Sequence, residues 1–397
     1  LKLLLRSAAA EIMHSRVGSC VVGGLAAVPW SRRSSMCQAD SKPSYYGSYL
    51  GDRFGGGIGQ RVGISEIDKQ ILPGTGVARV AFLSETHGRL REWATKDNWR
   101  AATCIHKAAY FTRSENLAQE AVLEHLREHY ASCTDSLDHR PVDAALFRLE
   151  DGDALARKLA TKGLKQIPTV VYGVFDERRE TCVVDFAAKR LGGGWLSYGM
   201  AQEEKLFMER FDLGALCARS LLELPGDPAK EPLASPFSMR PDEAWILRGA
   251  PAYAEIPWYG RTPKDGLSRV RLLSPLDDVD TAPTIVAIDA IKADFPTYQR
   301  GHLEMMMAKA YTGFCAAKDD REVGGYPRIA TGSWGCGAFH NNERVMFVIQ
   351  TLAANLADVE LTYHVLGDGV RLGPAFAFLE GALVEKLTVS ETLDLLV

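Results

Sequence analysis

The feature that most constrains the fold is a change of pattern near residue 166. Beyond it, short apolar runs alternate with amphipathic stretches. The runs with strand character span residues 169–175, 179–186, 244–249, 284–291, 326–332 and 359–367. Residues 341–357 instead place Val345, Ile349, Leu352 and Leu356 on one helix face. Strands separated by helices predict an α/β domain over residues 166–397, with a mixed or mainly parallel sheet.

Two further zones are expected before this domain. Residues 1–65 are rich in Ser, Gly and Tyr and show no sustained apolar period, which predicts a disordered or targeting extension. The first 35 residues carry several Arg and Ser and only one acid, Glu11, as an organelle transit peptide would. Residues 66–165 are expected to form a mainly helical accessory region. In residues 114–130, Ser114 is the expected N-cap, and the apolar face consists of Val122, Leu123, Leu126 and Tyr130.

Composition excludes some classes of protein. The net charge of −4 does not favour binding to duplex nucleic acid, and no stretch approaches the roughly 20 apolar residues that span a bilayer. The 8 Cys are scattered without a C-x-x-C pair, which indicates a reducing compartment. We expect a monomer without a membrane partner, acting in the nucleus or cytoplasm. The N-terminal stretch leaves the mitochondrion as an alternative.

Two motifs have simple structural explanations. His125, Glu128 and His129 fit the zinc-protease pattern H-x-x-E-H, but the segment is as charged as a solvated helix face, and no third ligand suggests itself. The glycine cluster at residues 55–59 follows no strand, so a flexible linker is the favoured interpretation. We therefore expect no metal.

A more specific motif follows the run at 179–186. It contains a strand residue, a triple glycine and a polar triplet at the apparent start of a helix: Asp185, Gly192, Gly193, Gly194, Gln202, Glu203 and Glu204. Glycines let backbone N–H groups approach a ligand, so a phosphate here would be held by N–H dipoles. Adjacent acids in a first turn are stabilised by the helix dipole in any protein, so QEE alone indicates a helix start rather than a catalytic pair.

A second strand, glycine loop and helix unit occupies residues 326–357. The sequence YPRIATGSWGCGAF carries Gly332, Gly335 and Gly337 ahead of the helix. Two such units, one with paired carboxylates, suggest a ligand with several phosphates and a bond cut by acid chemistry. A diphosphate sugar nucleotide would satisfy both loops.

At these residues the chain resembles the poly(ADP-ribose) glycohydrolase family. The family signature is resembled by the GGG triplet, which seven residues separate from QEE. The family's ATGNWGCGAF loop is resembled by IATGSWGCGAF. APAYAEIPWYGR, TIVAIDAI with AKAYTGF, and KLTVSETLDLL match further family segments in order, from about residue 165 to the end. The resemblance implies a macrodomain, a mixed sheet with helices on both faces.

The resemblance also implies an activity and a set of residues. The family hydrolyses the ribose–ribose O-glycosidic bond of poly(ADP-ribose) and releases ADP-ribose without a cofactor. Its partners are the polymer and ADP-ribosylated proteins. Glu204 would be the general acid/base, Glu203 would hold ribose hydroxyls, Gln202 would orient the site, and Tyr253 would cover the adenine. The other implied binding residues are Gly192, Gly193, Gly194, Asp185, Ser333, Gly335, Cys336, Gly337, Ala338, Phe339 and the adenine-reading acid Asp176 or Glu177.

Two departures from the family pattern leave an alternative open. Ala188 and Ser333 stand where the family has asparagines, and each change loses an amide donor and acceptor. Glu203 and Glu204 are neighbours and cannot easily flank a sugar, so one acid/base glutamate with a raised pKa is expected. The alternative is a weakened macrodomain that binds ADP-ribose without cutting it.

Overall fold

The computed structural model describes residues 2–14, 65–110, 117–133, 137–173, 175, 180–196, 200–222, 237–277, 281–293, 297–318, 328–366 and 369–397. The strands of its main sheet are β1 (Ser65–Ile71), β2 (Val77–Thr86), β3 (Pro141–Leu149), β4 (Thr169–Tyr172), β5 (Cys182–Ala187), β6 (Glu243–Arg248), β9 (Thr284–Asp289), β10 (Arg328–Thr331) and β11 (Glu360–Val365). Two short strands, β7 (Ala254–Glu255) and β8 (Arg271–Leu272), form a separate small sheet.

Within the described ranges, the main sheet has nine strands in the order β1-β2-β3-β6-β9-β5-β10-β11-β4. Neighbours from β1 to β9 pair antiparallel, and those from β9 to β4 pair parallel. The predicted mixed sheet is therefore confirmed. Each of the six runs that were predicted as strands overlaps one of these strands.

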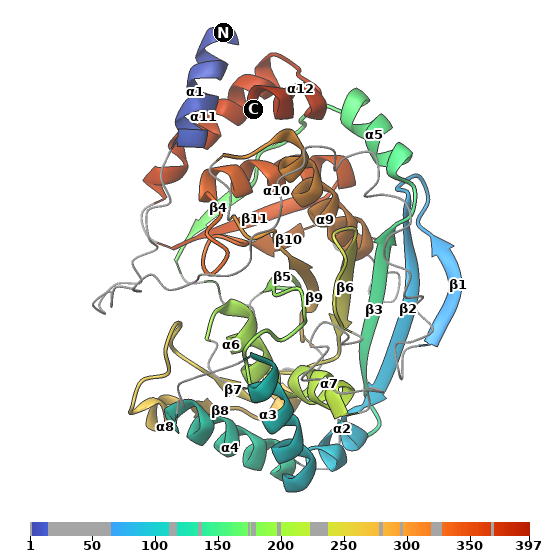
Figure 1. The fold of residues 1–397 in the computed structure, drawn as a ribbon, viewed down its shortest axis with the longest axis vertical. Coiled ribbons are helices and arrows are strands. Elements are labelled where there is room, and N and C mark those ends of the chain that lie inside the picture. The colour runs from blue at the N-terminus through green and yellow to red at the C-terminus, as the bar shows by residue number, and fades with distance from the viewer. Residues whose placement is uncertain are drawn as a thin grey trace.

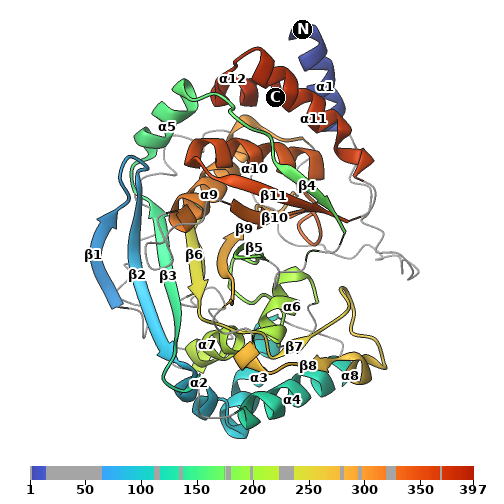
Figure 2. The ribbon, with the colours of Figure 1, turned by 180° about the vertical axis from the view of Figure 1, so that it is seen from behind.

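Helices cover both faces of the sheet. They are α1 (Lys2–His14), α2 (His87–Trp93), α3 (Lys96–Tyr110), α4 (Leu117–Ser132), α5 (Gly152–Thr161), α6 (Gln202–Glu209), α7 (Phe211–Leu222), α8 (Gly266–Arg269), α9 (Arg300–Lys318), α10 (Glu343–Ala357), α11 (Gly373–Val384) and α12 (Val389–Leu395). In β9, Val286 and Ile288 pack in the core with α9 and α10, whereas Ile285 and Ala287 pack with α4, α6 and α7. Strand side chains that alternate between two cores require layers on both sides, as Figures 1 and 2 show.

The described helices gather at two ends of the molecule. Helices α2, α3, α4, α7 and α8 lie at one end, and α1, α11 and α12 lie at the other (Figures 1 and 2). Among the described residues, no helix has both the length and the apolar character needed to cross a membrane.

Residues 65–165 contain strands that the sequence did not reveal. Alongside α2 to α5 they form β1, β2 and β3, and β3 pairs with β6 from Asp143↔Arg248 to Arg148↔Glu243. The sheet therefore runs across the predicted boundary at residue 165. Strands β2 and β3 are difficult to recognise in the sequence because several of their buried positions are alanines. Alanine has a low strand propensity.

The first described residues differ from the predicted unstructured extension. Leu5, Ala9 and Ile12 lie on one face of α1 and are buried in the core with α11. A Cβ at Gly381 of α11 would lie 2.5 Å from Leu5 Cδ2, so a glycine is what allows this close approach. Residues 15–64, including the glycine cluster at 55–59, lie outside the described residues, as does the expected N-cap Ser114.

Candidate active site

Both glycine loops begin at the same edge of the sheet. β5 and β10 are parallel neighbours, so the loops that follow Ala187 and Thr331 leave from adjacent carboxyl ends. A Cβ at Gly332 would lie 3.3 Å from Phe186 Cζ, which confirms how close the two segments are. Ligands of open α/β sheets bind at this edge.

The first loop can be built only with glycine. Gly192 and Gly193 have φ of +86° and +48°, a backbone conformation that other residues rarely adopt. A Cβ at Gly193 would lie 2.5 Å from Glu204 Oε1 and 2.7 Å from Glu203 Oε2. The loop therefore lies directly against both carboxylates.

The N–H groups of this loop bind the glutamates. Gly192 N donates to Glu203 Oε1 at 2.7 Å, and Gly194 N donates to Glu204 Oε1 at 3.0 Å. Gly193 N donates to the Arg190 carbonyl at 3.1 Å. This arrangement differs from the expectation that these N–H groups would hold a phosphate. The carboxylates of Glu203 and Glu204, in the first turn of α6, lie against the loop and accept the hydrogen bonds from its N–H groups.

The two glutamates differ in exposure. Glu203 is 3% exposed, and its Oε2 also accepts from Ala188 N at 2.8 Å. Glu204 is partly exposed, and its Oε2 accepts from Ala201 N at 2.9 Å, which caps the start of α6. Of the two carboxyl groups, that of Glu204 is the more exposed.

Burial raises both carboxyl pKa values. The pKa of Glu203 lies well above its ordinary value because of burial and the nearby Asp185 and Glu204, although its two backbone N–H partners act to lower it. Burial also raises the pKa of Glu204, while the N–H groups of Gly194 and Ala201 act to lower it. A raised pKa keeps a carboxyl group protonated to higher pH, which is what a general acid needs.

Gln202 joins the start of α6 to strand β5. Gln202 Oε1 accepts from Phe186 N at 2.8 Å, and its Nε2 donates to the Val184 carbonyl at 3.3 Å. β10 pairs with β5 at Ala330↔Val183, so Gln202 satisfies strand groups next to that bridge. Asp185 of β5 is fully buried, and its charge is close enough to raise the pKa of Glu203.

The second loop contains backbone N–H groups that are not used by any described residue. Gly335 has φ of +70°, and its carbonyl accepts from Asn341 N at 3.1 Å and from Asn341 Nδ2 at 3.2 Å. Gly337 and Ala338 are exposed, and Phe339 is half-buried. No residue that the structure describes accepts a hydrogen bond from the N–H groups of residues 337–339.

Ser333 and Cys336 face protein partners. Ser333 Oγ donates to the Glu343 carboxylate, which also pairs with Arg371 Nε at 2.9 Å. Cys336 is buried, and its Sγ lies 3.4 Å from the Trp334 carbonyl. The hydroxyl hydrogen of Ser333 is thus already engaged, so this side chain has acceptor capacity left for a ligand.

Tyr253 does not lie at the site, contrary to expectation. It is fully buried, packs edge-on against Tyr130 with ring centroids 5.0 Å apart, and places its hydroxyl 3.5 Å from His87 Nδ1. Tyr259 of the same segment lies beside α6, with its ring centroid 5.6 Å from Lys205 Nζ.

Other sequence candidates lie elsewhere. Asp176 and Glu177 fall outside the described residues. His129 Nε2 is hydrogen-bonded to the Leu273 carbonyl at 2.8 Å. In the described ranges, no three His, Cys, Asp or Glu side chains are arranged to hold a metal ion.

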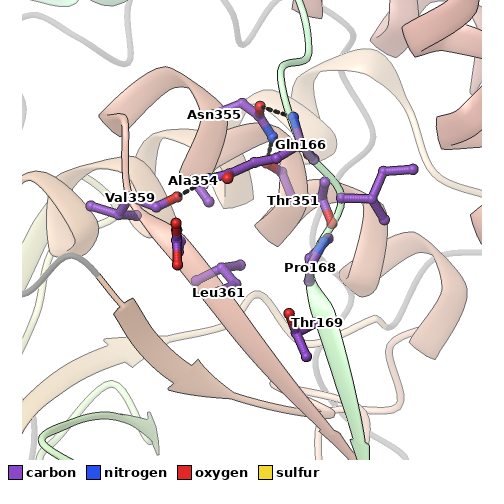
Figure 3. A pocket seen from close by; sticks show the side chains of 10 residues that line it. Gln166, Pro168, Thr169, Thr351, Ala354, Asn355, Val359 and Leu361 are labelled. Atoms are coloured by element: carbon purple, nitrogen blue, oxygen red, sulfur yellow. Dashed lines mark hydrogen bonds between the residues drawn. The ribbon is translucent and has the colours of Figure 1, made fainter.

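Figure 3 shows a cavity of about 160 Å³ whose lining includes no residue of α6 or of the two glycine loops. Its lining includes Thr169 and Glu360, the first residues of the parallel strands β4 and β11, whereas the glycine loops follow strand ends. Asn355 in its wall accepts from Gln166 N at 3.1 Å and donates to the Gln166 carbonyl at 2.9 Å. These polar groups are satisfied within the protein.

Comparison with known proteins agrees with this geometry. Residues 236–371, which include the second loop, match a family model described as poly(ADP-ribose) glycohydrolase, macro domain fold. This part of the chain is similar to the macro domain of the poly(ADP-ribose) glycohydrolase family. The predicted macrodomain fold is thereby confirmed, together with the helix-covered mixed sheet.

Two Caenorhabditis elegans proteins are similar to the chain. Poly(ADP-ribose) glycohydrolase 1 is 30% identical over 268 residues, covering 59% of this chain and 30% of that protein. Poly(ADP-ribose) glycohydrolase 2 is 30% identical over 196 residues, covering 47% and 37%. The chain thus spans about a third of the length of these relatives. A solved poly(ADP-ribose) glycohydrolase from Thermomonospora curvata is 18% identical, with a TM-score of 0.40, over 67% of this chain and 98% of that one.

Proposed function

We propose that this chain hydrolyses the ribose–ribose O-glycosidic bonds of poly(ADP-ribose) and releases ADP-ribose, with Glu204 as the general acid/base. The observation that carries the proposal is the Glu204 carboxyl group. It is partly exposed, has a raised pKa and is held by Gly194 N and Ala201 N at the edge where both glycine loops meet. The match of residues 236–371 to the poly(ADP-ribose) glycohydrolase model and the similarity to a poly(ADP-ribose) glycohydrolase of Caenorhabditis elegans support the choice of substrate.

The chemistry needs one group that both gives and takes a proton. Protonated Glu204 gives its proton to the leaving ribose oxygen as the glycosidic C–O bond breaks, leaving an oxocarbenium-like sugar. The resulting carboxylate takes a proton from the water that adds to that carbon, which restores the acid. Glu203 and Glu204 bind the same loop, so they do not flank a sugar from opposite sides as a two-carboxylate mechanism requires.

The remaining residues would bind the substrate. The N–H groups of residues 337–339 suit a diphosphate, because backbone donors of a loop can attract anions without Lys or Arg. The half-buried ring of Phe339 suits packing against a ribose. Glu203 has lone pairs left for ribose hydroxyls beyond those that Gly192 and Ala188 use. Poly(ADP-ribose) and ADP-ribosylated proteins are the proposed partners.

The test is product release from poly(ADP-ribose), measured by chromatography. We expect the wild type to release ADP-ribose, and Glu204→Gln to slow release by about 10² to 10⁴, the usual contribution of a general acid/base. Glu380→Gln is the matched control, because Glu380 is an exposed glutamate on α11. Equal rates for the wild type and Glu204→Gln would remove Glu204 from the mechanism.

The second candidate function is binding of ADP-ribose without cleavage. It is favoured by Ala188 and by the engagement of Ser333 with Glu343, since both positions lack the amide of the family pattern. This candidate predicts saturable calorimetric binding of ADP-ribose with no product in the same assay. Turnover by the wild type would exclude it.

A further inference from the structure

Helix α6 carries a buried ion pair directly after the two glutamates. Lys205 Nζ lies 2.7 Å from Glu209 Oε2, one helical turn further on. The two residues are only 9% and 6% exposed. Burying two charges is costly, and such a pair is often no more stabilising than apolar side chains of the same size. A specific structural role would explain why a buried ion pair stands at this position.

Both members of the pair hold the segment 253–260. Glu209 Oε1 accepts from Ile256 N at 2.6 Å, and the Glu209 carbonyl accepts from Tyr253 N at 2.7 Å. Lys205 lies over the Tyr259 ring, in the position of a cation–π contact. The pair therefore joins the segment to α6 along the last turns of the helix.

The same segment continues to the start of α6. Gly260 N donates to the Met200 carbonyl at 2.8 Å, and the neighbouring Ala201 N donates to Glu204 Oε2. Strand β7 in this segment contacts α6, and the two lie close together in Figure 1. Tyr259 is consequently fixed at both sides, by Lys205 and by Gly260, and remains partly exposed near the turn that binds Glu204.

We propose that Lys205 and Glu209 are positioning residues, which fix the Tyr259 ring as a wall of the ligand site beside Glu204. The ring would contact a ring of the ligand, and the pair would act only through the segment 253–260. This inference rests on the proposed function for its choice of substrate. The attachment of the segment to α6 is testable without any substrate.

The kinetic test compares three variants in the ADP-ribose release assay. Lys205→Met removes the cation and keeps an unbranched stem, Lys205→Arg keeps the cation, and Tyr259→Ala removes the ring. We expect Lys205→Met and Tyr259→Ala each to raise KM by about tenfold, the size of one aromatic contact, with kcat changed much less. Lys205→Arg should restore most of the loss. In the Tyr259→Ala background, Lys205→Met should raise KM no further.

The substrate-free test is hydrogen exchange at the amides of Ile256 and Gly260. Lys205→Met should speed their exchange by about tenfold, because the lone Glu209 carboxylate no longer stays packed. Arg157→Met removes the cation of an exposed pair with Asp151 and should leave these amides unchanged. Should Lys205→Met fail to fold, Glu209→Gln is the substitute, because it keeps an oxygen for Ile256 N and removes the charge.

The outcomes separate the two proposals. Wild-type KM and wild-type exchange in Lys205→Met would overturn the positioning role. A further rise in KM when Lys205→Met is added to Tyr259→Ala would also overturn it, since the lysine would then act by another route. A wild-type protein that releases no ADP-ribose contradicts the proposed function, and hydrogen exchange still decides whether the pair positions the segment.

Discussion

At the scale of single residues, the site depends on a close fit between a glycine loop and two carboxylates. The sequence predicted that the Gly192 loop and Glu204 belong to one site. It did not predict that the loop donors are used by the glutamates, because this depends on how side chains in the first turn of α6 point. Tyr253 was misplaced for a similar reason: contacts with Glu209 hold its segment so that Tyr253 lies in the core, whereas Tyr259 remains partly exposed.

Gly193→Ala tests this fit. A Cβ at Gly193 would collide with Glu204 Oε1 and Glu203 Oε2, in a backbone conformation that alanine disfavours. We expect a loss of about 1 to 3 kcal/mol in the free energy of unfolding, measured in urea, and at least a roughly tenfold loss of ADP-ribose release. Gly74→Ala is the control, because Gly74 has a similar φ of +66° but no atom within 4 Å of the added Cβ. Equal effects of the two changes would contradict the account.

At the scale of elements, the strand and helix propensities of the residues determined which elements could be predicted from the sequence. Strands rich in Val and Ile, such as residues 284–289, were evident, and so was the helix over 343–357 with its regular apolar spacing. Strands β2 and β3 were missed because alanine carries many of their buried positions. Helix α1 was missed because its basic residues resemble a targeting segment, whereas its apolar face depends on α11, far away in sequence.

Ile12→Asp tests the packing of α1. Ile12 is fully buried, so an aspartate there would place a charge in the core and leave a gap. We expect the free energy of unfolding to fall by about 2 to 4 kcal/mol, measured by urea denaturation. Ala10→Asp adds the same charge at an exposed position of α1 and should change stability by less than about 0.5 kcal/mol. If both variants unfold at the same urea concentration, α1 does not pack as described.

At the scale of the whole molecule, the main sheet unites zones that the sequence divided. The predicted boundary at residue 165 was based on a change in the pattern of apolar residues. Such a pattern indicates local secondary structure but does not indicate which strands pair. The sheet order places β3 of the earlier zone against β6 of the later one. Tyr311 of α9 also donates to the Thr75 carbonyl at 2.8 Å, which links the same two zones. The support for the site is therefore continuous from residue 65 onward.

A fragment of residues 166–397 tests this continuity. Without β3, the hydrogen-bonding groups of β6 would be exposed as a new sheet edge, which favours aggregation. The apolar contacts of Ala145 and Phe147 with the core would also be lost. We expect the fragment to show no cooperative thermal unfolding, while the full chain does. A fragment that unfolds cooperatively and releases ADP-ribose would show that residues 65–165 are dispensable.

The most direct test of the central claim, that Glu204 is the acid/base of a glycosidase, is the pH dependence of kcat/KM for ADP-ribose release. Only the protonated carboxyl group can donate to the leaving oxygen, so activity should fall as pH rises through the pKa of Glu204. Because burial raises the pKa of Glu204, we expect the activity to fall at a pH above 4.5, the ordinary pKa of a glutamate. The residual activity of Glu204→Gln should not show this fall. The same fall in Glu204→Gln, or a wild-type rate that only rises with pH, would contradict the account.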